Sequence, residues 1–260
     1  MPGPLLVDRP LDGVVRLTLA LPERRNAMTE ELTDAWRDAV ADIAADRDVR
    51  VVVVTGEGKA FCAGGDLSWL GAGARNPMEL RDRMLPFYRT WLGIRDLEVP
   101  TVAALNGAAI GAGLCLALGC DLRYATPEAK LAMPFTALGM HPGMAATYLL
   151  PEAVGMARAR EMLFTGRVYT GAEAVGIGLV NDVFPAETLL DEALAVAGRI
   201  AATAPIATRL TKRAMQHGPR SFVEALEWEA LAQPVTLASD DLREGLQAQA
   251  ERRTPVFRGH

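Results

Sequence analysis

Two glycine-rich turns are the parts of this chain whose residue types and spacing could do chemistry. The first lies in Lys59–Leu67 (KAFCAGGDL), and the second lies further along the chain in Asn106–Leu114 (NGAAIGAGL). Each turn follows a β-like run and precedes the start of a helix, so its backbone N–H groups remain unpaired. Two such turns aimed at one point form an oxyanion hole, which stabilises negative charge developing on a carbonyl oxygen.

The turns and several further segments resemble the crotonase superfamily, also called the enoyl-CoA hydratase/isomerase family, over nearly the whole chain. The segments that carry the resemblance are Pro22–Ala27, Phe61–Leu67, Asn106–Asp121, Leu163–Gly166, Ala172–Val180 and Arg243–Gly245. The resemblance implies a protein that binds acyl-CoA or enoyl-CoA thioesters and stabilises an enolate made from them. It implies no cofactor, because CoA is part of the substrate.

Individual positions take their expected roles from this resemblance. Gly65 and Ala112 match the two oxyanion donors, which act through the backbone N–H, and Gly64 and Gly111 allow the backbone to approach the thioester closely. Asp66 is expected to cap a helix and hold the loop. The other expected substrate or CoA contacts are Arg24, Arg25, Ala27, Ala63, Leu67, Pro134, Phe135 and Phe257, with the two arginines as candidates for phosphate contact.

The sequence departs from the family at the catalytic acids. A standard hydratase of this family uses two glutamates, and aligning this chain on the motifs puts Cys115 and Phe135 at those positions. A branch of the isomerases uses one acid after a proline, and Gly143 stands there. No Asp or Glu lies between Glu128 and Glu152, so a small alignment shift does not restore the second glutamate.

Other groups could move the proton. Histidine is the side chain type suited to proton transfer near neutrality, so His141 is one candidate. Cys115 lies in the first turns of an expected helix, whose dipole lowers the pKa of a thiol, although a small buried cysteine filling the wall is the other reading. Glu79 and Asp82 lie on the expected wall Ser68–Arg89 and could swing in. Two alternatives therefore stay open: a non-catalytic acyl-CoA carrier, or a thioester isomerase or hydrolase on the same fold.

The elements that must position these residues follow from hydrophobic patterns. Strands are expected at Val14–Leu21, Val49–Thr55, Thr101–Leu105, Leu122–Ala125 and Lys130–Met133, and a helix capped by Thr29 is expected to reach Ile43. They predict an α/β protein with the ββα spiral core of the crotonase type over residues 1–185. Residues 186–260 are expected to be helical, with a break near Ala204–Pro205. The family resemblance implies that these helices pack on a neighbouring subunit, so we expect a trimer or a dimer of trimers.

Composition and charge narrow the possible binding partners, the cellular compartment and the kinds of site. A net charge of −5 argues against binding to nucleic acid or an anionic membrane, and three cysteines without metal-ligand spacing suggest a reducing cytoplasm and no metal site. Val99–Cys120 holds 22 residues without a charge, a length within the range of a membrane helix. Its glycines, Pro100 and Asn106 instead favour a strand, a turn and a buried helix.

Overall fold

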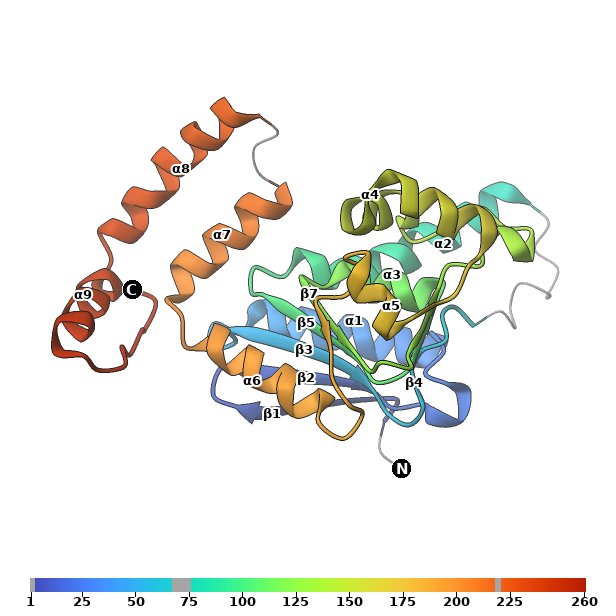
Figure 1. Cartoon of the computed structure of the whole chain (residues 1–260), viewed down its shortest axis with the longest axis horizontal. Helices are drawn as coiled ribbons and strands as arrows, with labels where there is room; N and C mark the ends of the chain where they lie inside the picture. The colour runs from blue at the N-terminus through green and yellow to red at the C-terminus, as the bar shows by residue number, and fades with distance from the viewer. Residues whose placement is uncertain (1–2, 67–75, 218–220) are drawn as a thin grey trace.

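Two sheets of mostly parallel strands form the centre of the protein (Figure 1). The computed structural model describes residues 3–66, 76–217 and 221–260. One sheet has the order β1-β2-β3-β5-β7-β10 and the other the order β4-β6-β8-β9. Their bounds are β1 Leu5–Leu11, β2 Val14–Leu19, β3 Val51–Gly56, β4 Ala60–Cys62, β5 Thr101–Leu105, β6 Ala108–Ile110, β7 Leu122–Ala125, β8 Lys130–Ala132, β9 Tyr169–Thr170 and β10 Asp182–Val183.

Successive ββα units build both sheets at once. The pairs β3–β4, β5–β6 and β7–β8 each give one strand to the larger sheet and the next to the smaller, and each pair is followed by a helix. The strands from neighbouring units pair in parallel in both sheets. The chain therefore winds as the spiral that the sequence predicted, and the short β4 and β6 end beside each other.

Nine α-helices are described around the sheets (Figure 1). Their bounds are α1 Glu30–Ala45, α2 Pro77–Leu92, α3 Ala112–Gly119, α4 Ala146–Thr165, α5 Gly171–Gly176, α6 Leu189–Ala201, α7 Pro205–His217, α8 Phe222–Leu237 and α9 Asp240–Glu251. As expected, Thr29 caps α1, and its side chain accepts a hydrogen bond from the Leu32 N–H. The expected break near Pro205 separates α6 from α7.

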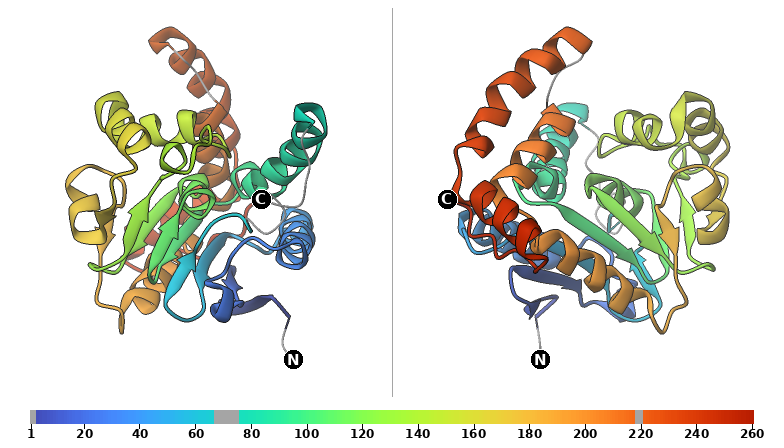
Figure 2. Two further views of the ribbon diagram at one scale, coloured as in Figure 1. Left: turned by 90° about the vertical axis from the view of Figure 1, so that its right-hand side faces the viewer. Right: turned by 60° about the vertical axis from the view of Figure 1, so that its left-hand side comes forward.

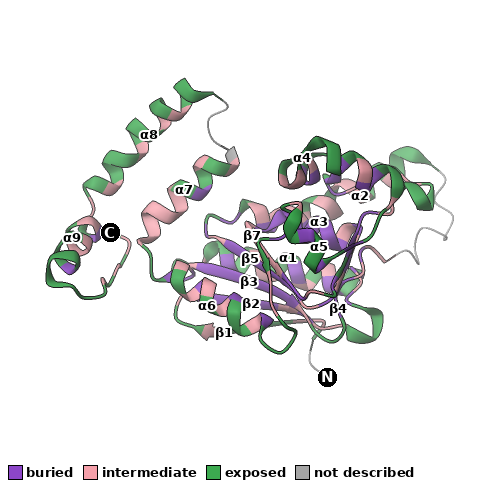
Figure 3. Ribbon diagram, viewed as in Figure 1, coloured by how far each residue is buried: buried purple, intermediate pink, exposed green. Residues whose placement is uncertain are grey.

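The alternating side chains of β3 serve two cores. Val52 and Val54 face the main core, which α1 to α4 help to enclose, whereas Val51 and Val53 face α6. The α6 helix meets them with alanines and a leucine at helical spacing, namely Leu189, Ala193, Ala197 and Ala201. A strand covered on both faces must be apolar throughout, which is the reason for the unbroken valine run. Figure 3 shows these strands as the buried centre of the molecule.

The helices α8 and α9 lie away from the sheets (Figures 1 and 2), whereas α7 is tied to the core through the buried Lys212, which donates to the Val99 carbonyl at 2.8 Å. No residue of α8 is buried, although it carries large apolar side chains at Phe222, Val223, Leu226, Leu231 and Val235. This arrangement is compatible with the expected oligomer, which stays a prediction. The boundary at residue 185 also stays a prediction, and α6, the first helix after it, packs on the larger sheet.

The uncharged segment from Val99 to Cys120 forms β5, β6 and the short buried helix α3, as its glycines and Pro100 indicated. Within the described ranges, we find no helix with the length and apolar character needed to cross a bilayer.

Candidate active site

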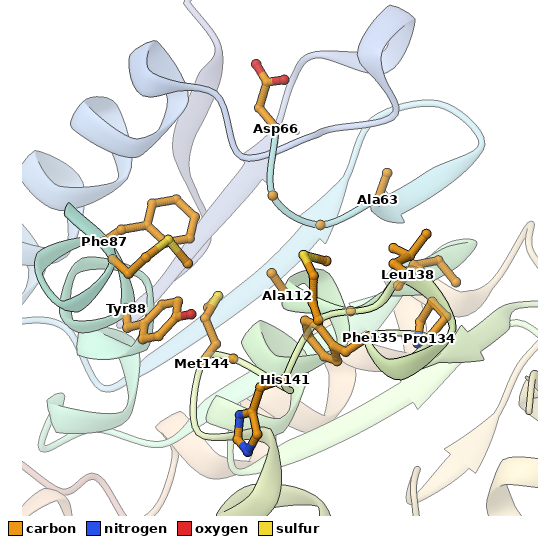
Figure 4. Close-up of a pocket in the computed structure, with 17 residues that line it drawn as sticks. Ala63, Asp66, Phe87, Tyr88, Ala112, Pro134, Phe135, Leu138, His141 and Met144 are labelled. Carbon is orange, nitrogen blue, oxygen red and sulfur yellow. The ribbon is translucent and has the colours of Figure 1, made fainter. Parts of the chain in front are cut away.

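A cavity of about 180 Å³ opens where the two glycine-rich turns meet (Figure 4). Residues of four separate segments line it: Ala63–Asp66, the second half of α2, Ile110–Ala112 and Pro134–Met144. Most of the lining is apolar, and the side chains that enclose the space include Met84, Phe87, Tyr88, Phe135, Leu138, Met140 and Met144. Of the residues for which the sequence predicted a role, Ala63, Gly64, Gly65, Asp66, Gly111, Ala112, Pro134, Phe135, His141 and Gly143 lie around it.

The two turns pack so closely against each other that glycine is required where they meet. Gly64 has φ of +100°, and a Cβ atom there would lie 2.7 Å from the Ile110 carbonyl oxygen. Gly113 is equally constrained, since its Cβ would lie 2.2 Å from the Cys62 carbonyl oxygen. Such separations are shorter than any real carbon–oxygen contact, so only glycine allows the segments to approach this closely.

Gly65 and Ala112 present backbone N–H groups at this junction. Ala112 is the first residue of α3, where no intrahelical acceptor exists, and Gly65 follows the constrained Gly64. Neither N–H has a hydrogen-bond partner among the described residues. A Cβ atom on Gly65 would meet nothing within 4 Å in the part of the chain that the structure describes. Both N–H groups thus belong to residues that line the same cavity.

The turn at Pro22–Ala27 lies against the first of these segments. The Ala63 N–H donates to the Arg25 carbonyl at 3.0 Å, and the Met28 N–H donates to the Gly64 carbonyl at 2.9 Å. Asn26 is fully buried and holds the turn, because its amide donates to the Ala60 carbonyl at 2.8 Å. The turn and the glycine segment therefore form one structural unit.

Of the two arginines in this turn, Arg24 is the one that reaches toward the cavity rim. Its guanidinium lies 2.7 Å from the carboxylate of Asp66, and about half of the Arg24 side chain is exposed. Asp66 thus holds the loop through an ion pair. Asp66 was also expected to cap a helix beginning after it, but the residues of that expected helix lie outside the described residues. Leu67 and the part of the expected wall from Ser68 to Arg75 lie outside them as well.

From the sequence we expected the family's acids at Cys115, Phe135 and Gly143, and of these three residues Phe135 and Gly143 line the cavity. The Cys115 thiol lies 3.7 Å from the Gly143 carbonyl oxygen, and the Phe135 ring lies against Gly111. Among the described lining residues, the rim residue Asp66 is the only carboxylate. The lining at Phe135 and Gly143 is therefore apolar or small, and the buried Cys115 contacts Gly143 without lining the cavity itself.

Cys115 is not an activated thiol. Its side chain is fully buried, and burial raises the pKa of the thiol well above its usual value. The expectation that the dipole of α3 lowers this pKa is wrong, because desolvation of the thiolate outweighs the dipole. The alternative reading, a small cysteine that fills the wall, agrees with the structure.

His141 lines the cavity but its ring points away from the glycine turns (Figure 4). The residue is exposed, and Nδ1 lies 2.8 Å from the Pro142 carbonyl oxygen. Glu79 and Asp82 are also exposed, and neither lines the cavity. The structure therefore brings none of these three charge-bearing side chains to the oxyanion donors.

Phe257 lies elsewhere in the protomer. Its ring lies against Gly245 of α9, and it lines a separate hollow together with residues of α7 and α9. The basic C-terminal segment Arg252–Arg258 folds back on α9, where Arg253 pairs with Glu244 and the Arg258 N–H donates to Asp241. Phe257 and the cavity are thus not brought together within one chain.

From the sequence we expected a wall at Ser68–Arg89 but did not identify the helix α2 or its lining residues. Met84, Phe87 and Tyr88 recur at helical spacing and place three side chains on one face of this helix, toward the cavity. The spacing is a signal that could have been found, but the charges and glycines before it favoured an irregular wall.

Comparisons with known proteins agree with this geometry. The family model described as enoyl-CoA hydratase/isomerase matches residues 10–260. The probable enoyl-CoA hydratase EchA12 of Mycobacterium tuberculosis is 38% identical, over 97% of this chain and 92% of that protein. An enoyl-CoA hydratase from Bacillus anthracis superposes with a TM-score of 0.93 at 35% identity, covering 99% of this chain and 100% of that one. A probable enoyl-CoA hydratase/isomerase from Mycobacterium abscessus gives a TM-score of 0.90 at 38% identity, over 98% and 99% of the two chains.

The fold is therefore the crotonase fold, as the sequence predicted. The chain belongs to the enoyl-CoA hydratase/isomerase family, a family of lyases and isomerases.

Proposed function

We propose that the protein binds an acyl-CoA thioester with its acyl group in the cavity and stabilises the thioester enolate through the N–H groups of Gly65 and Ala112. One observation carries the proposal: two unpaired N–H groups lie at one cavity, at a junction that only glycine permits. A negative oxygen placed between such donors is stabilised most strongly where water is excluded.

The polar part of CoA would then run along the turn Pro22–Ala27. Arg24 and Arg25 supply positive charge for the phosphates, and Ala27, Ala63 and Leu67 supply backbone contacts. Arg24 already binds one carboxylate at the cavity rim, which supports an anion-binding role. Phe257 could join this site only from a neighbouring subunit, which would require the expected trimer or dimer of trimers.

The hydratase reaction itself needs a proton donor in place of the absent glutamates at Cys115, Phe135 and Gly143. A 2-enoyl-CoA and a 3-enoyl-CoA of short chain, incubated with the purified protein, test this. Loss of the conjugated absorbance with a gain of one water in the product mass is the expected result. Movement of the double bond without added mass would instead make the protein an isomerase, and release of free CoA would make it a hydrolase.

A non-catalytic acyl-CoA carrier is the second candidate function, and the lack of a carboxylate beyond Asp66 in the described lining favours it. Isothermal titration with a non-reactive thioether analogue of an acyl-CoA separates the possibilities. Binding of the analogue together with no turnover of any enoyl-CoA would support the carrier. Failure to bind both the analogue and the enoyl-CoA thioesters would overturn the proposed function.

A further inference from the structure

The hydroxyl of Tyr88 occupies the space that a side chain at Gly143 would need. A Cβ atom built on Gly143 would lie 2.5 Å from the Tyr88 hydroxyl oxygen and 3.0 Å from the ring carbon that bears it. Gly143 is the position at which the family's isomerase branch is expected to carry its acid. A phenol from α2 thus lies where the family resemblance led us to expect a carboxylate.

Tyr88 is held in place by an aromatic stack on α2. Trp91 is fully buried, stacks on Trp36 of α1 with 5.0 Å between ring centroids, and donates its indole N–H to Thr33 at 3.0 Å. Phe87 lies against both Trp91 and Tyr88. Tyr88 is therefore anchored from behind, and Figure 4 shows its hydroxyl pointing into the cavity toward Met144.

The surroundings keep this hydroxyl protonated. Among the described residues, none forms a hydrogen bond with it, and partial burial raises the pKa of the phenol above its usual value. The buried Cys115 thiol from α3 acts in the same direction. Across the cavity the other titratable groups are Asp66, paired with Arg24, and His141, whose ring points away. The Tyr88 hydroxyl is therefore protonated, and no described residue accepts its hydrogen bond in place of a substrate.

We infer that the Tyr88 hydroxyl delivers the proton to the α-carbon of the thioester enolate, in place of the glutamates that this chain lacks. The inference rests on the proposed function, because it requires an enolate held by Gly65 and Ala112. It assigns the reacting acid to Tyr88 of α2, a residue to which the sequence analysis gave no role.

The step balances without a further reactant in a hydration. Water adds to the β-carbon of the enoyl thioester, and the electron pair of the double bond moves to the carbonyl oxygen to give the enolate. The enolate pair then forms the bond between the α-carbon and the Tyr88 proton. The resulting phenolate takes the proton that the added water releases, so the product has gained one water and Tyr88 is regenerated.

The variant Tyr88→Phe tests the inference, because it removes the hydroxyl and keeps the ring in the aromatic stack. We expect kcat to fall by about 10²–10⁴-fold, the usual effect of losing a positioned acid, with KM and analogue affinity within about twofold. Tyr124→Phe is the matched control, since Tyr124 lies on β7 against Phe184, away from the cavity, and its activity should be unchanged.

A second readout separates proton transfer from packing. For the wild type in D₂O, the product should carry deuterium at the α-carbon, and the rate should fall as pH rises through the phenol pKa. Replacing Tyr88 by a fluorinated tyrosine, which has a lower pKa, should move that fall to lower pH. Replacing Tyr124 by the same fluorinated tyrosine should leave the pH at which the rate falls unchanged.

The outcomes are distinct. An equal kcat for Tyr88→Phe and wild type, or a pH profile that fluorination does not move, would overturn the inference and leave the proposed binding and enolate stabilisation intact. Binding of the thioether analogue without turnover or deuterium incorporation in the wild type would also overturn it and support a carrier. Failure to bind any of these thioesters would remove the proposed function and the inference together.

Discussion

The two sides of the cavity are built on different principles. One side, Gly64–Gly65 and Gly111–Ala112, offers backbone N–H groups whose position is set by strands β4 and β6 and the start of α3. The other side consists of side chains from α2 and from the segment Pro134–Met144. Backbone N–H groups can stabilise charge whatever the nearby side chains are, but a Cβ atom added at Gly64 or Gly113 would collide with a backbone carbonyl oxygen. Proton transfer depends on which side chains face the cavity.

The largest effect is expected from Gly64→Ala, which attacks the backbone side. The positive φ and the close Ile110 carbonyl should lower the free energy of unfolding by about 1–3 kcal/mol. Displacing the adjacent donor should also lower kcat by about 10²–10³-fold. Urea denaturation and enoyl-CoA turnover measure the two effects.

Gly65→Ala is the matched control for that variant, because its Cβ would meet no atom of the described residues within 4 Å. We expect its free energy of unfolding to stay within about 0.5 kcal/mol of the wild type. Equal losses of stability for the two variants would contradict the idea that Gly64 alone sets the contact between the segments.

Gly143→Ala disturbs the side-chain side without removing a functional group. The added methyl would collide with the Tyr88 hydroxyl, so kcat should fall by about 10²-fold or more, with Gly143 contributing no chemistry of its own. In a Tyr88→Phe background the same substitution should cost much less, since both changes remove one proton donor. Additive losses in a double-mutant cycle would show that the two residues act independently.

Arg24→Ala is expected to act on binding alone. Loss of an exposed charge contact is worth about 1 kcal/mol, so KM for a CoA thioester should rise roughly three- to tenfold with kcat unchanged. The same thioester of pantetheine, which lacks the nucleotide phosphates, should show no change. Arg37→Ala is the control, because Arg37 is an exposed residue of α1 paired with Asp34. A rise in KM for both thioesters would assign Arg24 to the loop and not to the phosphates.

His141→Ala should have the smallest effect, less than about threefold on kcat, because the exposed ring points away from the oxyanion donors. A rate profile from pH 5 to 9 checks this. A loss of 10²-fold or more, together with disappearance of a limb near the ordinary histidine pKa of about 6.5, would return the proton-transfer role to His141.

The strands and the glycine turns could be predicted from the sequence because their signals are local. The unbroken valines of β3 and the run Thr101–Leu105 indicate strands covered on both faces, and β5 has the bounds that the sequence predicted. Strands β1, β4, β6, β9 and β10 were not predicted. Several have only two or three residues, too few for a periodic pattern, and they exist because neighbouring units supply their pairing partners.

The sequence by itself determined the family, the spiral of ββα units and the absence of a carboxylate at Cys115, Phe135 and Gly143, since residue type and order along the chain are enough for these. Only the tertiary structure brought the Tyr88 hydroxyl against Gly143. Tyr88 and Gly143 are 55 positions apart, and they meet because α2 packs on α1 through Trp91 and Trp36. It also decided that the Cys115 thiol is inert, because burial depends on the whole fold and outweighs the local helix dipole.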